Sequence, residues 1–355
     1  MSELSTLRQR VQPPVRSLPI VIFGAGSIVS DAHLPAYRQA GFAVAGIFDP
    51  DMGKAQSLAA AHETRAFASV DEAVGQGTGV VYDLAVPPAA TPGLLRVLPE
   101  GAVVLIQKPM GSDLAAADEI VAICRARRLR AAVNFQLRFA PNSLALKDAI
   151  ARGLLGEIVD FDAWLAVDTP WHLWAFLADL PRVEILLHSI HYLDFVRDLL
   201  GNPAGIHAKT IGHPGSTMSN TRSAMILDYG PRVRCALSIN HNHAFGRKFQ
   251  ACEFRICGTV GAAVMKLGVN LDYPRGEPDE LWLNTDGDWR QVPLLGNWFI
   301  EAFVGRITQV MRFAVGEDDV LLGSVEDAWH TMAVVEAAYE SSAAPAHPIR
   351  KAPHA

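Results

Sequence analysis

Short apolar runs alternate with helical stretches through the first 140 residues. The runs "PIVIF" (19–23), "FAVAGIFD" (42–49), "VVYDLAV" (80–86), "GAVVLIQ" (101–107) and "RAAVNF" (130–135) are separated by segments with helical periodicity. Strands that alternate with helices predict a parallel sheet with helices on both faces. The nearly continuous apolar character of these runs is typical of strands that are buried on both sides.

The pattern changes after Pro141. A helical segment (143–153) leads into an alternating strand (156–168) and a strongly apolar helix (184–201), which Gly201 and Pro203 end. Strand-like segments follow with few helices between them, at 205–212, 223–229, 232–244, 249–259, 262–268 and 279–285. Consecutive strands with short connections favour an antiparallel sheet. Two helical segments, 299–316 and 325–342, end the pattern.

Length and charge narrow the classes of protein and partner. A chain of 355 residues exceeds what one core usually organises, so we expect two domains. The formal net charge of −6 gives no electrostatic reason to expect a nucleic acid or an anionic membrane as partner. No apolar run is long enough to cross a bilayer. Residues 1–17 lack the apolar core of a signal peptide, and we expect a disordered tail there.

The four cysteines favour a reducing compartment. They form neither a C-x-x-C pair nor a dense framework, and stand at Cys124, Cys235, Cys252 and Cys257. Free thiols are the simpler interpretation of this spacing. We therefore expect a soluble, cytoplasmic protein.

A glycine turn follows the first apolar run. "IVIFGAGS" places Gly24 and Gly26 after a strand and before a helix. The first glycine allows a tight turn, the second lets the backbone approach a pyrophosphate, and the helix start offers unpaired N–H groups. Val29 stands where this fingerprint usually has glycine or alanine, so we expect a slightly displaced helix with the site retained.

Asp49 ends the second apolar run, about two dozen residues after the glycine turn. A carboxylate at this position binds the ribose hydroxyls of a dinucleotide and repels a 2′-phosphate. No arginine follows it directly, so NAD is favoured over NADP. The alternative role for Asp49 is a helix N-cap or turn residue.

Polar residues at two further places call for an explanation. Lys108, in "VLIQKPMG", leaves the carboxyl end of a buried strand, where ligands bind in such sheets. The apolar helix at 184–201 is interrupted by His188, His191 and Asp194 at steps of three. Burying polar groups costs free energy unless they find partners. A self-contained histidine–aspartate pair, a metal site and part of an active site are all open at this point.

In this order, the segments resemble the glucose–fructose oxidoreductase, inositol dehydrogenase and rhizopine-catabolism (Gfo/Idh/MocA) oxidoreductases. The resemblance rests on "GAGSIVSDAHLPAY", Asp49, "IQKPMG" at the family's Glu-Lys-Pro position, "NFQLRFAP", "HSIHYLDFVRDLLG" and "VVEAAYESS". It implies an α/β fold with a Rossmann doubly wound parallel sheet over 18–140. An α+β domain with a large open, mainly antiparallel sheet is implied over 141–325. Within 326–355, a helix that packs back on the first domain is implied, followed by a tail.

The resemblance also implies a catalytic site. Lys108, His191 and Asp194 match the family's catalytic lysine, histidine and neighbouring aspartate. Hydride transfer from a secondary alcohol to a nicotinamide requires removal of the hydroxyl proton, which a histidine can accept. An aspartate one turn along can orient the ring, and an ammonium can stabilise developing negative charge. Cofactor contacts are expected at Gly24, Gly26, Ser27, Ile28, Asp49, Ala85, Pro87 and Gln107.

The substrate side departs from the family pattern. Gln107 replaces the usual glutamate, which should ease deprotonation of Lys108. Tryptophan faces stack on sugar rings, and a guanidinium can hold a hydroxyl or carboxylate. Ordinary interdomain packing is the alternative for the tryptophans. "INHNHAFG" places two histidines on one strand face and two asparagines on the other, and either pair could face a cleft or a subunit interface. Substrate contacts are expected from Arg138, Trp171, Trp174 and His188.

These inferences predict an NAD-dependent oxidoreductase acting on a secondary hydroxyl of a sugar, cyclitol or related polyol. By the resemblance, it assembles as a homodimer or homotetramer through the open sheet. The alternatives are a redox-neutral, NAD-dependent glycosidase of the same family and a non-catalytic NAD-binding regulator. A metal site formed by His188, His191 and Asp194 is less favoured, because no further ligand cluster is evident and the family needs no metal.

Overall fold

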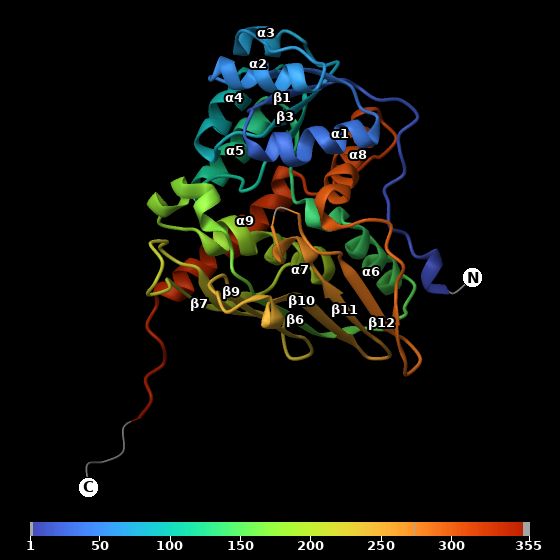
Figure 1. Ribbon diagram of the computed structural model, residues 1–355, viewed down its shortest axis with the longest axis vertical. Coiled ribbons are helices and arrows are strands. Elements are labelled where there is room, and N and C mark those ends of the chain that lie inside the picture. Colours follow the sequence, from blue (N-terminus) through green and yellow to red (C-terminus); the bar gives the residue numbers. More distant parts are fainter. Residues whose placement is uncertain (1–2, 274, 351–355) are drawn as a thin grey trace.

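Two β-sheets organise the chain. The computed structural model describes residues 3–273 and 275–350, except for the side chains of residues 3 and 174–176. One sheet has five strands and the other has eight. Figure 1 shows the first sheet in the upper part of the molecule and the second below, with α7 (Ile190–Leu200) and α9 (Val325–Ala343) between them. The predicted combination of a parallel α/β sheet and a large, mainly antiparallel sheet is confirmed.

The five-stranded sheet is parallel, with strand order β2-β1-β3-β4-β5. Most of its residues are buried, which explains why the sequence runs are almost wholly apolar. The chain adds β2 on one side of β1 and then β3, β4 and β5 on the other side. Ligands of such sheets bind at this change of direction, between β1 and β3, outside the carboxyl ends of the strands. The strands are β1 (Ile20–Phe23), β2 (Val44–Phe48), β3 (Val81–Leu84), β4 (Val103–Ile106) and β5 (Arg130–Val133).

Side-chain caps fix the start of three helices around this sheet. Each of these helices has an N-cap side chain that accepts a hydrogen bond from the backbone N–H three residues on, and the N-caps are Asp51, Ser69 and Asp113. This bond satisfies one of the free N–H groups at the start of each helix. The helices are α1 (Leu34–Ala40), α2 (Met52–Ala61), α3 (Val70–Val74), α4 (Thr91–Val97) and α5 (Leu114–Ala126).

The first domain takes a further helix from much later in the chain. α8 (Phe303–Ala314) packs against α1, and Phe303, Ile307 and Val310 share one hydrophobic core with Ile20 and Ile22 of β1. The division that gives residues 141–325 wholly to the second domain is therefore wrong for α8. The α8 helix is amphipathic, and the sequence of its apolar face does not indicate which of the two sheets it covers.

The eight-stranded sheet has strand order β13-β12-β11-β10-β6-β9-β8-β7, and all neighbouring pairs are antiparallel except β6 and β9. Alternate residues such as Phe161 and Leu165 point to the face that packs under α7. Helix α6 (Pro141–Ala151) leads into the sheet. The strands are β6 (Ile158–Ala166), β7 (Gly205–Ile211), β8 (Arg222–Asp228), β9 (Arg234–Asn240), β10 (Ala251–Gly258), β11 (Ala262–Lys266), β12 (Glu280–Asn284) and β13 (Trp289–Gln291).

The N-terminal segment is packed, not disordered. Leu4 and Leu7 are about 95% buried against the second domain. The backbone N–H of Arg8 donates to Asp148, and the side-chain amide of Gln9 donates to the carbonyl of Pro293. The expected disordered tail over residues 1–17 is therefore corrected for the described part. Two leucines three residues apart give this short segment an apolar face, which a polar composition concealed.

Helix α9 links the two domains. At its first half, Trp329 Nε1 donates to Asp118 of α5. At its other end, the backbone N–H of Thr210 in β7 donates to the hydroxyl of Ser342. The helix thus packs on the first domain, as the resemblance implies, and on the edge of the second sheet as well.

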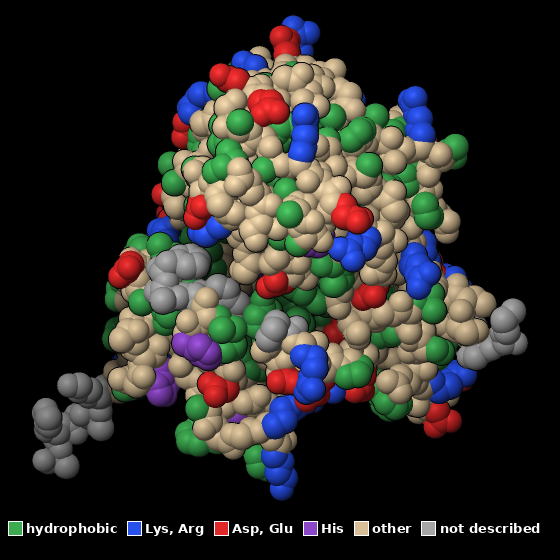
Figure 2. Space-filling model, turned by 45° about the horizontal axis from the view of Figure 1, so that its top comes forward, with side chains coloured by type: hydrophobic (Ala, Val, Ile, Leu, Met, Phe, Trp, Pro, Cys, Tyr) green, Lys and Arg blue, Asp and Glu red, His purple; other side chains and the backbone are tan. Residues whose placement is uncertain are grey.

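Charges of both signs are interspersed on the face shown in Figure 2, and hydrophobic side chains gather in a hollow between the upper and lower parts. In the described part of the chain, no helix combines the length and the apolar character needed to cross a membrane.

Two substitutions test the glycine turn. A Cβ on Gly24, whose φ is +107°, would lie 2.2 Å from the carbonyl oxygen of Ala85, whereas a Cβ on Gly26 meets no atom within 4 Å. We expect Gly24→Ala to lower the free energy of unfolding by more than about 1 kcal/mol. Gly26→Ala should leave the free energy of unfolding unchanged and weaken the binding of a dinucleotide. Chemical denaturation measures the stability and calorimetry measures the binding. Equal destabilisation by both variants would contradict the distinction between a sterically required Gly24 and an open Gly26.

Candidate active site

The glycine turn is tied to the end of β2 by Asp49. One carboxylate oxygen of Asp49 accepts from the N–H of Ala25 at 2.8 Å, and the other accepts from the N–H of Asp51 at 2.8 Å. The N-cap of α2 is Asp51, because its side chain accepts from Lys54. Asp49 is therefore not the helix cap, and its half-buried carboxylate stands beside the turn at the carboxyl edge of the sheet.

The helix after the turn begins irregularly. Ser27 is exposed and Ile28 is half-buried, so both remain accessible at the helix start. Residues Val29–His33 form a π-helical turn, and the Val29 side chain is fully buried. A π turn closes with hydrogen bonds between residues five apart, one more than in an α-helix, and it lies where valine replaces the usual small residue.

Ala85, Pro87 and Gln107 also lie along this edge. Ala85 follows β3 and its N–H donates to Phe23 in β1. Pro87 precedes a short 3-10 turn at Pro88–Ala90. The side-chain oxygen of Gln107 accepts from the N–H of Lys108 at 2.8 Å. Ala85 lies directly against Gly24, and Pro87 and Gln107 follow the carboxyl ends of β3 and β4.

A buried polar network that sequence analysis did not single out supports Gln107. His33 Nδ1 lies 2.7 Å from Asp83 Oδ2, and the Tyr37 hydroxyl donates to the same oxygen at 2.6 Å. Gln107 Nε2 lies 3.2 Å from His33 Nε2. Burial and the Asp83 carboxylate raise the pKa of Tyr37. The motif "SDAHLPAY" holds two of these residues, but their partner Asp83 stands in what reads as an apolar strand.

Lys108 is half-buried and faces the apolar helix. Its ammonium donates to the backbone carbonyl of Leu187 at 2.7 Å, and no salt bridge to it occurs among the residues that the structure describes. Burial lowers the pKa of Lys108 to about 8. Lys108 therefore titrates close to neutral pH, in the direction expected where an amide replaces glutamate at Gln107.

His191 lies one helical turn after Leu187, the residue whose carbonyl Lys108 contacts. Burial, and then Lys108, lower the pKa of His191 well below its ordinary value, so the ring is neutral at pH 7. Phe135 and Trp298 contact the imidazole edge-on, with centroids 6.5 and 5.5 Å away. Its Nδ1 atom is buried and has no hydrogen-bond partner within the described part of the protein. Aromatic packing thus orients the ring.

The expected pairing of His191 with Asp194 does not form. Asp194 accepts two hydrogen bonds of 2.6 Å from Arg138 and one of 2.9 Å from Thr331. Arg138 also forms an ion pair of 2.7 Å with Asp327 of α9. Residues three apart on a helix differ by about 60° in direction, which lets His191 face Lys108 while Asp194 faces Arg138. Asp194 is therefore corrected from a partner of His191 to a buried structural anion.

Arg138 is corrected for the same reason. Its guanidinium is 93% buried, and Asp194, Asp198 and Asp327 surround it. These carboxylates raise its pKa against the opposing effect of burial. A guanidinium that is fully engaged with protein carboxylates is not available to hold a substrate, so the expected substrate contact is not supported.

The other expected substrate residues lie on the second-domain side. His188 is half-buried, and its Nε2 atom lies 3.1 Å from the side-chain oxygen of Asn270. The Trp171 ring packs on His241, with centroids 5.3 Å apart. Of the two histidines in "INHNHAFG", His241 is fully buried and points toward His188. The side chain of Trp174 falls outside the described residues.

Comparison with protein families identifies both halves of the chain. Residues 18–135 match the model described as "Oxidoreductase family, NAD-binding Rossmann fold", and residues 143–264 match the "GFO/IDH/MocA C-terminal domain". The chain belongs to the Gfo/Idh/MocA oxidoreductase family. The family membership implied by the sequence motifs is confirmed.

Gfo/Idh/MocA relatives align over differing shares of the chain. A 1,5-anhydro-D-fructose reductase of Ensifer adhaerens is 25% identical over 278 residues, 77% of this chain and 82% of that protein. An inositol 2-dehydrogenase of Leifsonia xyli subsp. xyli is 31% identical over 151 residues, 40% of this chain and 43% of that protein.

A solved structure shares the family fold. An oxidoreductase from Agrobacterium radiobacter, described in complex with NAD⁺, L-tartaric acid and magnesium, has a TM-score of 0.78 and 19% identity. The alignment covers 92% of this chain and 97% of that one. At this identity the likeness shows the fold alone.

A substitution separates a structural from a catalytic role for Asp194. We expect Asp194→Asn to destabilise the protein by about 3–5 kcal/mol, because it leaves the buried Arg138 without its main counter-charge. Asp198→Asn is the comparison, since Asp198 is more exposed and lies 3.4 Å from Arg138, so its loss should be smaller than that of Asp194→Asn. Urea denaturation measures both. If the Asp194→Asn protein keeps its stability but loses turnover, the result would instead support the expected role of Asp194 as the partner of His191.

Proposed function

We propose that this protein is an NAD-dependent oxidoreductase that transfers a hydride from a secondary hydroxyl of a sugar, cyclitol or related polyol to NAD. The observation that carries the proposal is the placement of two basic groups beside the carboxyl edge of the dinucleotide-type sheet. The ammonium of Lys108 donates to the carbonyl of Leu187, and buried His191 lies one turn further along the same helical segment. The names of the reductase and inositol dehydrogenase relatives support the substrate class.

The residues present fit a dinucleotide. The open space beside Gly26 and the exposed start of the helix at Ser27 offer backbone N–H groups to a pyrophosphate. Asp49 offers a carboxylate where an adenosine ribose would bind, and its charge favours NAD over NADP. Ile28, Ala85, Pro87 and Gln107 would line the remaining edge. When bound, the nicotinamide supplies the acceptor for the hydride.

The protonation states support a division of roles that differs from the one favoured by sequence. Sequence alone favours His191 as base and Lys108 as the group that polarises the oxygen. With its pKa lowered to about 8, the Lys108 amine is a stronger base than the His191 imidazole, whose pKa is shifted well below its ordinary value. A pKa near the working pH suits proton transfer. We infer that Lys108 accepts the hydroxyl proton and that neutral His191 positions the hydroxyl.

We also propose that two or four copies assemble through the outer face of the eight-stranded sheet. Trp164 and Ile226 expose about half of their side chains there, on β6 and β8. Large apolar side chains on an open sheet face are typical of an interface. The four cysteines are free thiols, which supports a reducing, cytoplasmic location.

The pH dependence tests the assignment of Lys108. A base must be unprotonated to accept a proton, so kcat/KM for alcohol oxidation should rise with pH and level off above about 8. The reverse reduction needs the ammonium form and should fall above the same pH. Spectrophotometry of NADH across pH 6–10 measures both directions. If oxidation instead declines as the pH rises through 8, Lys108 acts as a cation and His191 as the base.

Alanine substitutions test whether the pair carries the chemistry. Lys108→Ala and His191→Ala should each lower kcat by about 10²–10⁴-fold, because the first removes the group that accepts the proton and the second removes the group that positions the hydroxyl. NAD binding, measured by calorimetry, should be spared. Lys54→Ala and His330→Ala, both at exposed positions, are the matched controls.

The substrate class is tested with a panel of sugars, inositols, sugar acids and glycosides. Net formation of NADH with a polyol supports the dehydrogenase. Glycoside cleavage without net NADH identifies the redox-neutral glycosidase, and NAD binding without turnover of any compound identifies the regulator. Full activity of both alanine variants would refute the assigned roles.

A further inference from the structure

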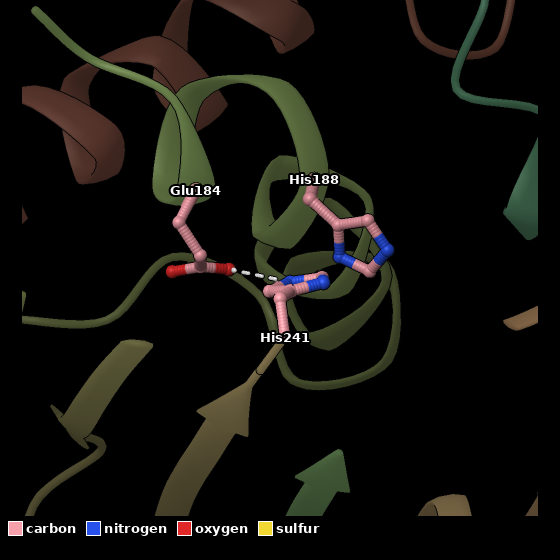
Figure 3. A group of neighbouring side chains, drawn as sticks. All are labelled: Glu184, His188 and His241. Atoms are coloured by element: carbon pink, nitrogen blue, oxygen red, sulfur yellow. Dashed lines mark ion pairs between the residues drawn. The ribbon is translucent and has the colours of Figure 1, made fainter. Parts of the chain in front are cut away.

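A second cluster of titratable side chains lies beside the proposed active site. Glu184 and His188 belong to a π-helical segment (Glu184–Ser189), and His241 follows the end of β9. Figure 3 shows the three side chains converging from these two elements. One potential ligand atom from each lies within 4.8 Å of the others. The cluster adjoins the proposed active site because Leu187, next to His188, accepts the hydrogen bond from Lys108.

The two imidazoles are oriented with one nitrogen bonded and one free. His188 Nε2 lies 3.1 Å from the side-chain oxygen of Asn270, and His241 Nδ1 lies 2.7 Å from the hydroxyl of Thr169. His188 Nδ1 and His241 Nε2 are buried and have no hydrogen-bond partner in the described part of the chain. Metal-binding histidines show this arrangement, in which the outer ring nitrogen donates to a fixed acceptor and the inner lone pair faces the ion.

Glu184 adds a buried negative charge to these two nitrogens. Its side chain is fully buried, and its oxygens accept hydrogen bonds from the hydroxyls of Ser189 and Ser223. One of these oxygens lies 3.6 Å from His241 Nε2. Neutral hydroxyls do not balance a carboxylate charge, and buried charges are otherwise paired or coordinate metals. The carboxylate therefore favours a cation among these three residues.

We propose that Glu184, His188 and His241 bind one divalent transition-metal ion, through Oε1, Nδ1 and Nε2 respectively. Two imidazoles and a carboxylate form a ligand set that suits Zn²⁺, Mn²⁺ or Fe²⁺. Three protein ligands leave at least one coordination position open, as in zinc sites that bind water or substrate. The site goes beyond the proposed dehydrogenase activity, and its occupancy does not depend on that activity.

This ligand set differs from the one considered on sequence grounds. Only His188 is common to both, because His191 faces Lys108 and Asp194 faces Arg138. Glu184 and His241 are far apart in sequence. Glu184 stands in an apolar helical segment, and His241 stands in "INHNHAFG", whose sequence left a cleft and a subunit interface equally open. The chain fold is what brings them together.

Direct binding tests the site. Chelator-treated full-length protein is titrated with ZnCl₂, and separately with MnCl₂, by calorimetry. We expect one ion per chain for at least one metal, and at least 100-fold weaker binding in Glu184→Gln and in His241→Gln. The control His330→Gln alters an exposed histidine on α9 and should bind as the wild type does. Wild-type protein that binds neither ion below millimolar concentration refutes the site, as do variants that bind with unchanged affinity.

A second measurement covers variants that fail to fold. Because a ligand that binds only the native state stabilises it, the metal should raise the Tm of the chelator-treated wild type. Co²⁺ added to the wild type should produce visible absorption bands that excess Zn²⁺ displaces. The absence of both effects refutes the site without any variant. NAD titration on the same preparation reports cofactor binding separately, so loss of the metal site and failure of the dehydrogenase proposal are distinguished.

Discussion

The buried guanidinium of Arg138 is the interaction on which the arrangement of the two domains depends. Arg138 lies just beyond the last strand of the first sheet, and it binds Asp194 of α7 and Asp327 of α9. Arg197 of α7 binds the same Asp327. Breaking one partner of a buried ion pair costs far more than the pair contributes relative to apolar residues. These ion pairs therefore hold α7, and with it His191, in a fixed position relative to the sheet edge that carries Lys108.

The features that local sequence determines were predictable. Buried parallel strands have a continuous apolar signature, and the turn at Gly24 is required by a close approach to Ala85 that no side chain allows. Lys108 could be predicted as a site residue because a lysine at the carboxyl end of a buried strand stands where ligands bind. These inferences depend on short stretches of chain whose environment follows from strand order, and the family match agrees with them.

The features that depend on distant partners were not predictable in this way. The helix spacing suggested that Asp194 serves His191, yet Arg138 and Thr331 from two other elements take its oxygens. Asp83 reads as one polar residue in an apolar strand until His33 and Tyr37 are seen to bind it. Periodicity reports which residues share a face, while the partner of a buried charge is decided by tertiary packing.

Helix α8 makes the first domain discontinuous in sequence. Its side chains complete the core on one side of a sheet whose five strands all end by residue 133, so a fragment that stops at residue 140 would expose that apolar surface to water. During synthesis, the first 140 residues leave the ribosome long before their covering helix does. Closing this core requires a loop of well over 150 residues, and forming such long-range contacts slows folding. The second domain must therefore be largely made before the first is complete, which couples the folding of the two halves.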